Sequence, residues 1–264
     1  MYKVEILADS INPSKVRLTT FELVIPRVVL VELNTHRALS KSTSSSRAIP
    51  TKTLLDAVIT DPYIPDFSRN ASGMSEGGVF LSAEDQDSAA RWCLELRDLV
   101  VSKIQEAEKY KIHKQDINRY LEPWMWCTVL LTATDLQNFF KLRAHKDAAP
   151  PFRKFAFSMR QALTQSNPVQ LAAGEWHIPL RDLSLPVYDA LKVSTSRMAR
   201  ASYGRQHIVK SFVDEVAQHD DLSSKGHWSP FEHCAMALSG VDRVGNLRGY
   251  LQYRKLVEVI GGEP

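Results

Sequence analysis

The 264-residue chain predicts one α/β (α+β) domain, spanning residues 1–264, with a mixed sheet, long helices and an inserted helical part. Three observations predict this class. Hydrophobic residues make up 44% of the chain, which is enough for a full core. Strand-like alternation occurs near the N-terminus, and apolar residues at helical spacing recur through most of the remainder.

The first residues read as two strands and a helix. Residues 2–7 and 20–25 alternate apolar and polar side chains, as half-buried strands do. Pro26 suits the first turn of a helix, and the apolar residues at 29, 30 and 33 recur at helical spacing. Residues 34–47 therefore follow a strand-to-helix unit.

Helical periodicity dominates residues 82–163, which we interpret as the helical part of the domain. Ser82 is a candidate N-cap for a long amphipathic helix, whose apolar residues step by three and four up to Ala107. Pro151 opens another helix with one apolar stripe, and a third helix follows in the last third of the chain. We expect these apolar stripes to be core.

The net charge and the hydrophobic pattern limit the kinds of partner that we expect. A net charge of +3 is mild: it allows an anionic small molecule and does not demand nucleic acid. The N-terminal residues alternate like a strand instead of forming a charged and then apolar leader, and no apolar run approaches the length of a membrane span. We therefore expect a cytoplasmic protein without membrane contact.

Three cysteines, Cys93, Cys127 and Cys234, are odd in number and far apart, which argues against a disulfide framework. Cys127 lies in an apolar run, where burial would raise the thiol pKa and make it inert. A zinc site from His227, His233 and Cys234 is conceivable, but it lacks the paired spacing of zinc ligands, so no metal is predicted.

Residues 34–47 bring His36, Arg37, Arg47 and seven hydroxyl side chains, six of them at 40–46, into one short stretch. The Ser and Thr residues at 40–46 favour a loop, because short hydroxyl side chains bond to nearby backbone and compete with a helix. Two guanidinium groups beside hydroxyls suit a planar oxyanion such as phosphate. The alternative is a polar linker with solvated charges.

A helix beginning near Thr134 carries an unusual arginine. Thr134 and Gln137 form a capping-box pattern, and Arg143 then falls on the apolar stripe. Its guanidinium must snorkel to solvent at the helix end or meet a partner, because an unpaired buried charge costs several kcal/mol. The functional alternative is a guanidinium that faces a planar heterocycle.

A second capping-box pattern joins Ser229 and Glu232, with Pro230 in the first helical turn. This explains the segment structurally. His227, just outside it, could contact a ring or be an ordinary loop side chain.

His36 and Arg37, followed by seven residues and Ser45, resemble the R-H-R-x7-S signature of the flavin-dependent thymidylate synthases, with Thr35 at the first arginine. Arg47 falls where that family carries a substrate-binding arginine. Three further blocks are similar to the family's R-x-x-L-P, S-L-x-N-F-L-x-L-R and G-H-x-(S/T)-P-F-E-H motifs: residues 119–123, 135–143 and 226–233.

The order of the motifs predicts a circular permutation. The block at 226–233 normally precedes the R-H-R signature, but here it follows by nearly the whole chain. Residues 197–203 resemble the helix that opens family members. We therefore interpret residues 195–238 as the equivalent of the usual N-terminal segment, since permutation is tolerated where chain ends meet at a surface.

The resemblance implies reductive methylation of 2′-deoxyuridine 5′-monophosphate (dUMP) to dTMP, with FAD, NADPH and methylenetetrahydrofolate. It also implies a homo-oligomer, a tetramer by analogy, whose sites combine several chains. The implied catalytic residues are Arg143 and Ser45. The implied substrate-binding residues are Arg47, Arg119, Ser45 and Arg143. The implied flavin-binding residues are Thr35, His36, Arg37, Asn138, His227 and Ser229.

Departures from the family pattern leave alternatives open. Thr35 replaces an arginine, and Thr43, Thr132 and Thr134 also stand at or near positions where the family carries other residues. Flavin phosphate binding would then be rebuilt, with Arg197, Arg200, Arg248 and Arg254 as candidates.

Two other functions remain open. One is hydroxymethylation of the same nucleotide. The other is a nucleotide- or nucleic-acid-binding protein without chemistry, using aromatics such as Trp124, Trp126, Phe139 and Phe140. We expect no nucleic-acid partner, because these aromatics lie in apolar periodic runs typical of a core.

Overall fold

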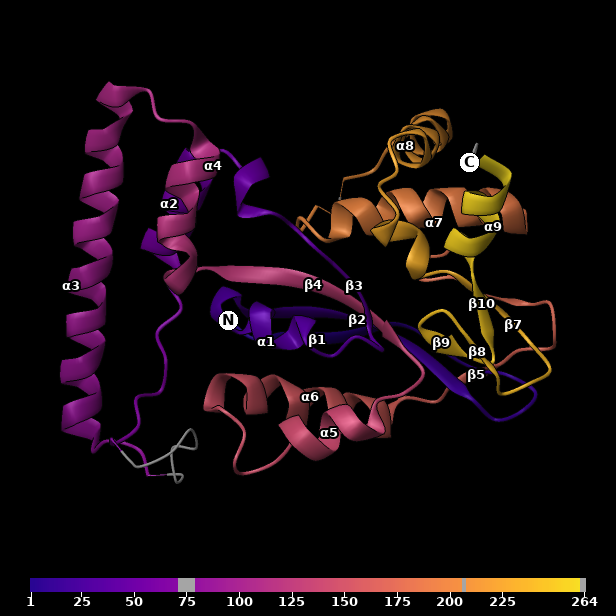
Figure 1. The fold of residues 1–264 in the computed structure, drawn as a ribbon, viewed down its shortest axis with the longest axis horizontal. Coiled ribbons are helices and arrows are strands. Elements are labelled where there is room, and N and C mark those ends of the chain that lie inside the picture. Colours follow the sequence, from indigo (N-terminus) through magenta and orange to yellow (C-terminus); the bar gives the residue numbers. More distant parts are fainter. Residues whose placement is uncertain (71–78, 206–207, 262–264) are drawn as a thin grey trace.

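A five-stranded mixed sheet forms the centre of the molecule (Figure 1). The computed structural model describes residues 1–70, 79–205 and 208–261. The strand order is β3-β4-β2-β1-β5, and only β5 runs parallel to its neighbour. The predicted class and the two predicted N-terminal strands are confirmed. The strands are β1 (Lys3–Ile11), β2 (Arg17–Pro26), β3 (Ser40–Thr43), β4 (Trp126–Ala133) and β5 (Val169–Gln170).

Two helices, α5 (Gln137–Arg143) and α6 (Pro150–Gln165), cover one face of this sheet (Figure 1). Alternate residues of β2 and β4 meet these helices, because successive side chains of a strand point to opposite faces. The predicted helix at Pro151 and its apolar stripe are confirmed. The main buried side chains of this layer are Phe21, Leu23, Ile25, Val129, Leu131, Phe139, Phe152, Phe155 and Met159.

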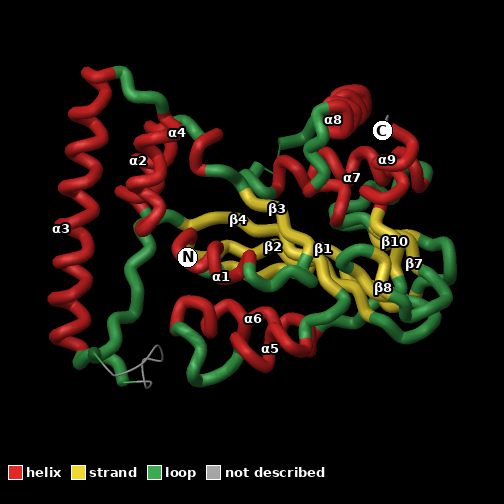
Figure 2. Tube along the Cα trace, viewed as in Figure 1, coloured by secondary structure: helices red, strands yellow, loops and turns green. Residues whose placement is uncertain are grey.

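The C-terminal third covers the opposite face (Figure 2). Its helices are α7 (Val187–Ala201), α8 (Phe212–Ser224), α9 (Tyr253–Gly261) and a 3-10 turn, η5 (Ser229–Glu232). Its short strands are β6 (Trp176–His177), β7 (Ala235–Ala237), β8 (Arg243–Val244), β9 (Leu247–Arg248) and β10 (Tyr250–Gln252). No helix in the described part of the chain is long and apolar enough to cross a membrane.

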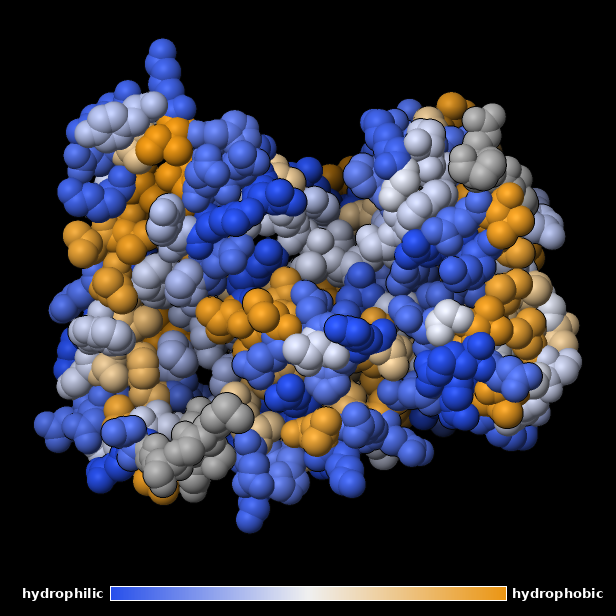
Figure 3. Space-filling model, viewed as in Figure 1, coloured by the Kyte–Doolittle hydropathy of each residue, from blue (hydrophilic) through white to orange (hydrophobic). Residues whose placement is uncertain are grey.

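The long predicted helix is α3 (Ala83–Ala107), and the Ser82 hydroxyl caps it by accepting from the Asp85 amide. It stands at one side of the molecule (Figure 1). The expectation that its stripe is core is only partly correct: Trp92 and Leu99 are 60% and 57% exposed, and apolar surface gathers over this region (Figure 3). The elements around it are α2 (Thr51–Thr60), η3 (Glu108–Tyr110), α4 (Lys114–Ile117) and η4 (Asn118–Trp124).

Two predictions of local structure are wrong. The stretch 82–163 is not wholly helical, because it includes β4, and a short apolar run reads equally well as a buried strand or helix. Residues 40–46 are not wholly loop, because β3 pairs with β4. There the hydroxyl of Thr43 donates to the Thr128 carbonyl, so hydroxyls that could have competed with regular structure instead bind across the sheet.

Both predicted capping boxes are also wrong. The helix α5 follows Leu136 without a side-chain cap, and the Thr134 hydroxyl instead accepts from the Arg248 amide at 3.0 Å. The turn η5 likewise has no side-chain cap, although Pro230 does lie in its first turn. The Glu232 carboxylate of this second pattern instead accepts from Arg254 Nη1 at 2.6 Å.

A chain of five hydrogen bonds, 2.7–2.9 Å long, crosses the buried face beneath the C-terminal third. It uses hydroxyls from four adjacent strands and two histidines, and each of these side chains is buried. Every hydroxyl and every neutral imidazole has one proton to donate, so the six groups together supply enough donors for the five hydrogen bonds. In order, its members are Ser10, His177, Thr20, Thr132, His233 and Ser42.

This chain of bonds docks the 226–233 motif on the sheet. His233, the last residue of the motif, bonds to Thr132 and Ser42 through its two ring nitrogens. Burial lowers the pKa of His177 to about 4 and that of His233 to about 3, so both are neutral at pH 7. A His233 so engaged cannot be a zinc ligand.

Candidate functional site

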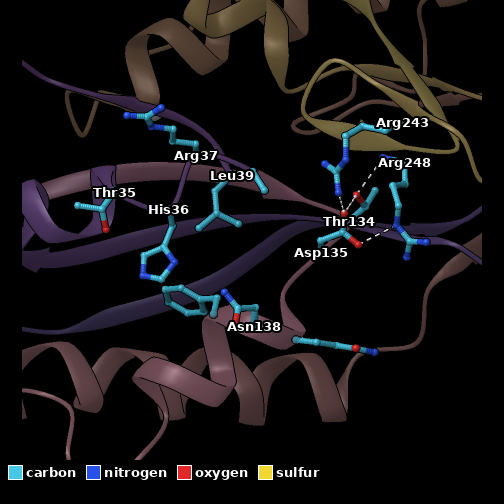
Figure 4. Close-up of a pocket in the computed structure, with 12 residues that line it drawn as sticks. Thr35, His36, Arg37, Leu39, Thr134, Asp135, Asn138, Arg243 and Arg248 are labelled. Atoms are coloured by element: carbon cyan, nitrogen blue, oxygen red, sulfur yellow. Dashed lines mark hydrogen bonds and ion pairs between the residues drawn. The ribbon is translucent and has the colours of Figure 1, made fainter.

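A cavity of about 500 Å³ lies where the end of α1 (Leu30–Asn34), the start of α5 and the β8-β9 hairpin meet (Figure 4). This volume falls in the range of small-molecule sites. Three basic side chains and one acidic side chain line it. Its lining residues are Thr35, His36, Arg37, Ala38, Leu39, Thr134, Asp135, Gln137, Asn138, Phe139, Arg243 and Arg248.

A hydrogen bond from Arg143 holds the His36 ring in one orientation. The Arg143 Nε donates to His36 Nε2 at 3.0 Å, so that nitrogen is the acceptor and the proton lies on Nδ1. Burial, Arg143 and Lys41 all lower the pKa of His36 below its usual value. The ring packs edge-on against Phe139, with centroids 5.2 Å apart. His36 therefore offers a neutral N–H donor beside an aromatic wall.

Arg143 does not snorkel freely. Its guanidinium stacks over the Phe152 ring at 4.6 Å and lies 3.4 Å from a Glu32 carboxylate oxygen. It is still one-quarter exposed. The predicted choice between snorkelling and pairing is thus resolved in favour of pairing, although Arg143 does not itself line the cavity. Its catalytic role stays a prediction.

The other end of the cavity holds an acidic residue between two arginines (Figure 4). One Asp135 oxygen pairs with Arg243 Nη2, and the other accepts from Arg248 Nε at 2.8 Å. The sequence predicts Arg248 as a candidate for phosphate binding. It does not predict Asp135, Gln137 or Arg243 as site residues. No local pattern could have found Arg243, because only the tertiary fold brings it to Asp135.

The predicted phosphate site forms a separate surface cluster. Arg47 and Arg119 are exposed on η2 (Ser46–Ala48) and η4, and the Asn118 amide joins these elements by donating to the Ser46 carbonyl at 2.8 Å. The Arg47 Nε donates to the Ser45 hydroxyl at 3.3 Å. These three predicted residues thus share one region, but none of them lines the cavity.

The predicted flavin residues divide in the same way. Thr35, His36, Arg37 and Asn138 line the cavity. His227 and Ser229 do not; both are exposed at the junction of α8 and η5. Within one chain, the motif residues therefore do not form one site.

Three of the four candidate replacement arginines are engaged elsewhere. Arg200 is buried and forms a bidentate ion pair with Glu215. Arg197 pairs with Asp182, and Arg254 pairs with glutamates 232 and 258. Only Arg248 lines the cavity.

Two of the four predicted aromatics and all three cysteines are buried. Trp124 and Phe139 are 4% and 2% exposed, which confirms the core interpretation for them. All three cysteines are free and buried, and burial raises the pKa of the Cys127 thiol to about 11. Among the described residues, no group of three or more His, Cys, Asp or Glu side chains is placed to hold a metal.

Fold and site together define an α/β protein with a cationic, partly aromatic cavity. Residues 13–169, more than half of the chain, match the model of the thymidylate synthase complementing protein family. The chain therefore belongs to that family and is a thymidylate synthase-like methyltransferase. The match includes the His36 to Ser45 signature and α5.

Two solved structures of PolB from Streptomyces cacaoi, a UMP/dUMP methylase, are similar. The structure bound with 5-Br UMP has a TM-score of 0.51 and 15% identity, covering 62% of this chain and 89% of that chain. The structure bound with 5-Br dUMP has a TM-score of 0.47 and 17% identity, covering 56% and 66%. The first likeness shows a shared fold. No curated protein matches the chain by sequence.

Proposed function

We propose that this protein is a cytoplasmic, flavin-dependent enzyme that methylates dUMP to dTMP, using methylenetetrahydrofolate and NADPH. One observation carries the proposal. The family-matched residues include both the His36 signature and α5, and these two segments meet at one cavity. The similar PolB fold, from a UMP/dUMP methylase, is in keeping with a pyrimidine nucleotide substrate.

The cavity residues fit a flavin or nucleotide. His36 supplies a neutral N–H donor, Asn138 an amide and Phe139 an aromatic edge. Arg37, Arg243 and Arg248 outnumber Asp135, which favours an anionic ligand. When bound, a flavin would supply hydride-transfer chemistry that side chains lack.

Arg143 and the surface cluster have the other proposed roles. Arg143, as a fixed cation, would stabilise the negative charge that develops on the uracil ring when C5 becomes nucleophilic. Ser45 would position the substrate, and Arg47 and Arg119 would bind its phosphate through charged hydrogen bonds.

A homotetramer would complete the site. Arg47, Arg119, His227 and Ser229 lie outside the cavity of their own chain, so a second copy must bring them to it if they act there. The exposed apolar side chains of α3, including Trp92, are available surface for such contacts. Light scattering on the purified protein measures this state directly.

The test is a defined reaction. Protein, FAD, NADPH, methylenetetrahydrofolate and C5-tritiated dUMP are mixed, and tritium release and product mass are measured. Tritium release with a methylated product supports the proposal. A hydroxymethylated product would assign the alternative chemistry, and a protein that neither takes up FAD nor releases tritium would contradict the enzyme proposal.

A further inference from the structure

A pair of arginines outside the family-matched residues lines the cavity. Arg243 and Arg248 lie opposite each other in the β8-β9 hairpin, far beyond residue 169. Figure 4 shows them at the end of the cavity opposite His36. The known motifs assign them no role.

Hydrogen bonds hold both arginines in place, and Asp135 holds the Arg248 guanidinium. Arg243 Nη1 donates to the Asn246 carbonyl at 2.9 Å, and the Arg248 amide donates to the Thr134 hydroxyl. The Asn246 amide in turn donates to the Ser40 hydroxyl, which ties the turn to the sheet. Fixed donors bind an anion with less loss of side-chain entropy than mobile ones.

Asp135 leaves the pair with an excess of positive charge. Its single carboxylate serves two guanidinium groups, one oxygen each. No described residue accepts from Arg248 Nη1 or Nη2, and Arg37 has no ion-pair partner among the described residues. The side chains of Arg243 and Arg248 are 45% and 42% exposed, so a ligand can reach them.

We propose that Arg243 and Arg248, positioned by Asp135, bind a phosphate or pyrophosphate group of the cavity ligand. Planar guanidinium groups suit the oxygens of phosphate, because each can present two parallel N–H donors. The ring of the same ligand then lies toward His36 and Phe139. The identity of that ring rests on the proposed function, whereas the phosphate follows from the arginines alone.

The test replaces both arginines by glutamine and compares the result with a variant of equal charge loss. The control, Arg91→Gln with Arg160→Gln, removes two exposed arginines that do not line the cavity. Binding of FAD, riboflavin, dUMP, deoxyuridine and inorganic pyrophosphate is measured for both variants and the parent. A third variant, Arg243→Lys with Arg248→Lys, keeps the charge and loses the planar fork.

We expect pyrophosphate affinity to fall by about tenfold or more in the glutamine variant and not in the control, as for lost charged hydrogen bonds. A matching loss for FAD but not riboflavin assigns the group to the flavin; a loss for dUMP but not deoxyuridine assigns it to the substrate. The lysine variant should fall between parent and glutamine variant.

Unchanged affinity for pyrophosphate, FAD and dUMP in a folded glutamine variant would overturn the inference and leave a purely structural ion-pair network. If the glutamine variant does not fold, the single variants Arg243→Gln and Arg248→Gln decide: parental affinities for all three anions in both would equally overturn it. A parent protein that binds pyrophosphate but no flavin would contradict the flavin proposal and leave the anion site standing.

Discussion

Arg143 and His36 form a coupled pair at the edge of the cavity. The guanidinium fixes the tautomer of the imidazole, and its stacking on Phe152 fixes the guanidinium. A lysine would keep the charge but lose the planar fork and the ring stacking. A substitution of Arg143 by lysine therefore tests whether the planar guanidinium, and not only its charge, is needed.

Arg143→Lys should lower kcat by about 10² to 10³, as for other single electrostatic contacts to a transition state. Flavin binding and thermal stability should change little. Steady-state kinetics with flavin titration separates these effects. Turnover close to that of the parent would remove Arg143 from the mechanism.

The two buried histidines predict acid sensitivity. An unfolded chain takes up a proton at each histidine near pH 6.5, while the folded protein resists until about pH 4 for His177 and about pH 3 for His233. The free energy of unfolding should therefore fall as the pH drops below 6.5, by up to about 1.4 kcal/mol per pH unit for each histidine. Above about pH 7 neither contributes a slope.

The variant His233→Gln isolates one of these contributions. Glutamine can still donate to one hydroxyl and accept from the other, but it does not titrate. Denaturant titrations at about pH 7, 6 and 5 should show a smaller pH slope than in the parent. An identical slope in both proteins would show that His233 does not cause the acid sensitivity.

At the scale of elements, close backbone contacts hold the C-terminal segment on the sheet. Ala235 and Ala237 of β7 pack against Val16 and Leu18, where β2 begins. The circular permutation predicted from the order of the motifs stays a prediction. The Asn12 amide nearby donates to three carbonyls of this segment, those of residues 238, 240 and 249.

Gly249→Ala should break this contact. Gly249 has φ +65°, and a Cβ there would lie 2.7 Å from the Gly240 carbonyl oxygen and clash with Asn12 Nδ2. The matched control is Gly174→Ala, with φ +88° and nothing within 4 Å of the added Cβ. Both variants incur left-handed strain of about 1–2 kcal/mol.

Gly249→Ala should lose about 2 kcal/mol more than the control, because it displaces a buried, hydrogen-bonded amide. Chemical denaturation of both variants gives the difference. Equal losses would mean that strain alone matters and that the Asn12 contact adjusts freely.

At the scale of the whole molecule, the division of motif residues between cavity and surface predicts complementation. Arg119→Ala should weaken dUMP binding by about 1.5 to 3 kcal/mol through loss of a charged hydrogen bond. If another copy supplies Arg119 to the cavity, mixed oligomers with Arg143→Lys contain some sites with both native arginines. Co-expression of the two variants should then give more turnover than their separate activities summed.

The control mixes the same two variants at the time of the assay, after each has been purified separately. Few mixed oligomers form in this sample, because subunits exchange slowly between oligomers. Simple additivity in the co-expressed sample, with heteromers verified by mass spectrometry, would place each site within one chain.

Local sequence was sufficient to predict those strands and helices that bury a single, regularly spaced row of apolar side chains. The alternation in β2 and the apolar spacing of α6 each match one face of one layer, so periodicity was sufficient. The signature around His36 was also local, and its residues Thr35, His36 and Arg37 line the cavity, whereas Ser45 does not. These features depend on neighbours within one or two turns of chain.

Only the tertiary structure decided the features that join distant segments. Hydroxyls that read as loop residues in 40–46 became β3, because β4 supplied hydrogen-bond partners. The Thr134 hydroxyl accepts from the Arg248 amide instead of capping α5. Asp135 forms an ion pair with Arg243, which lies more than 100 residues further along the chain. Sequence spacing cannot encode such pairs, since their energy depends on separations that exist only after the sheet and the C-terminal third have packed together.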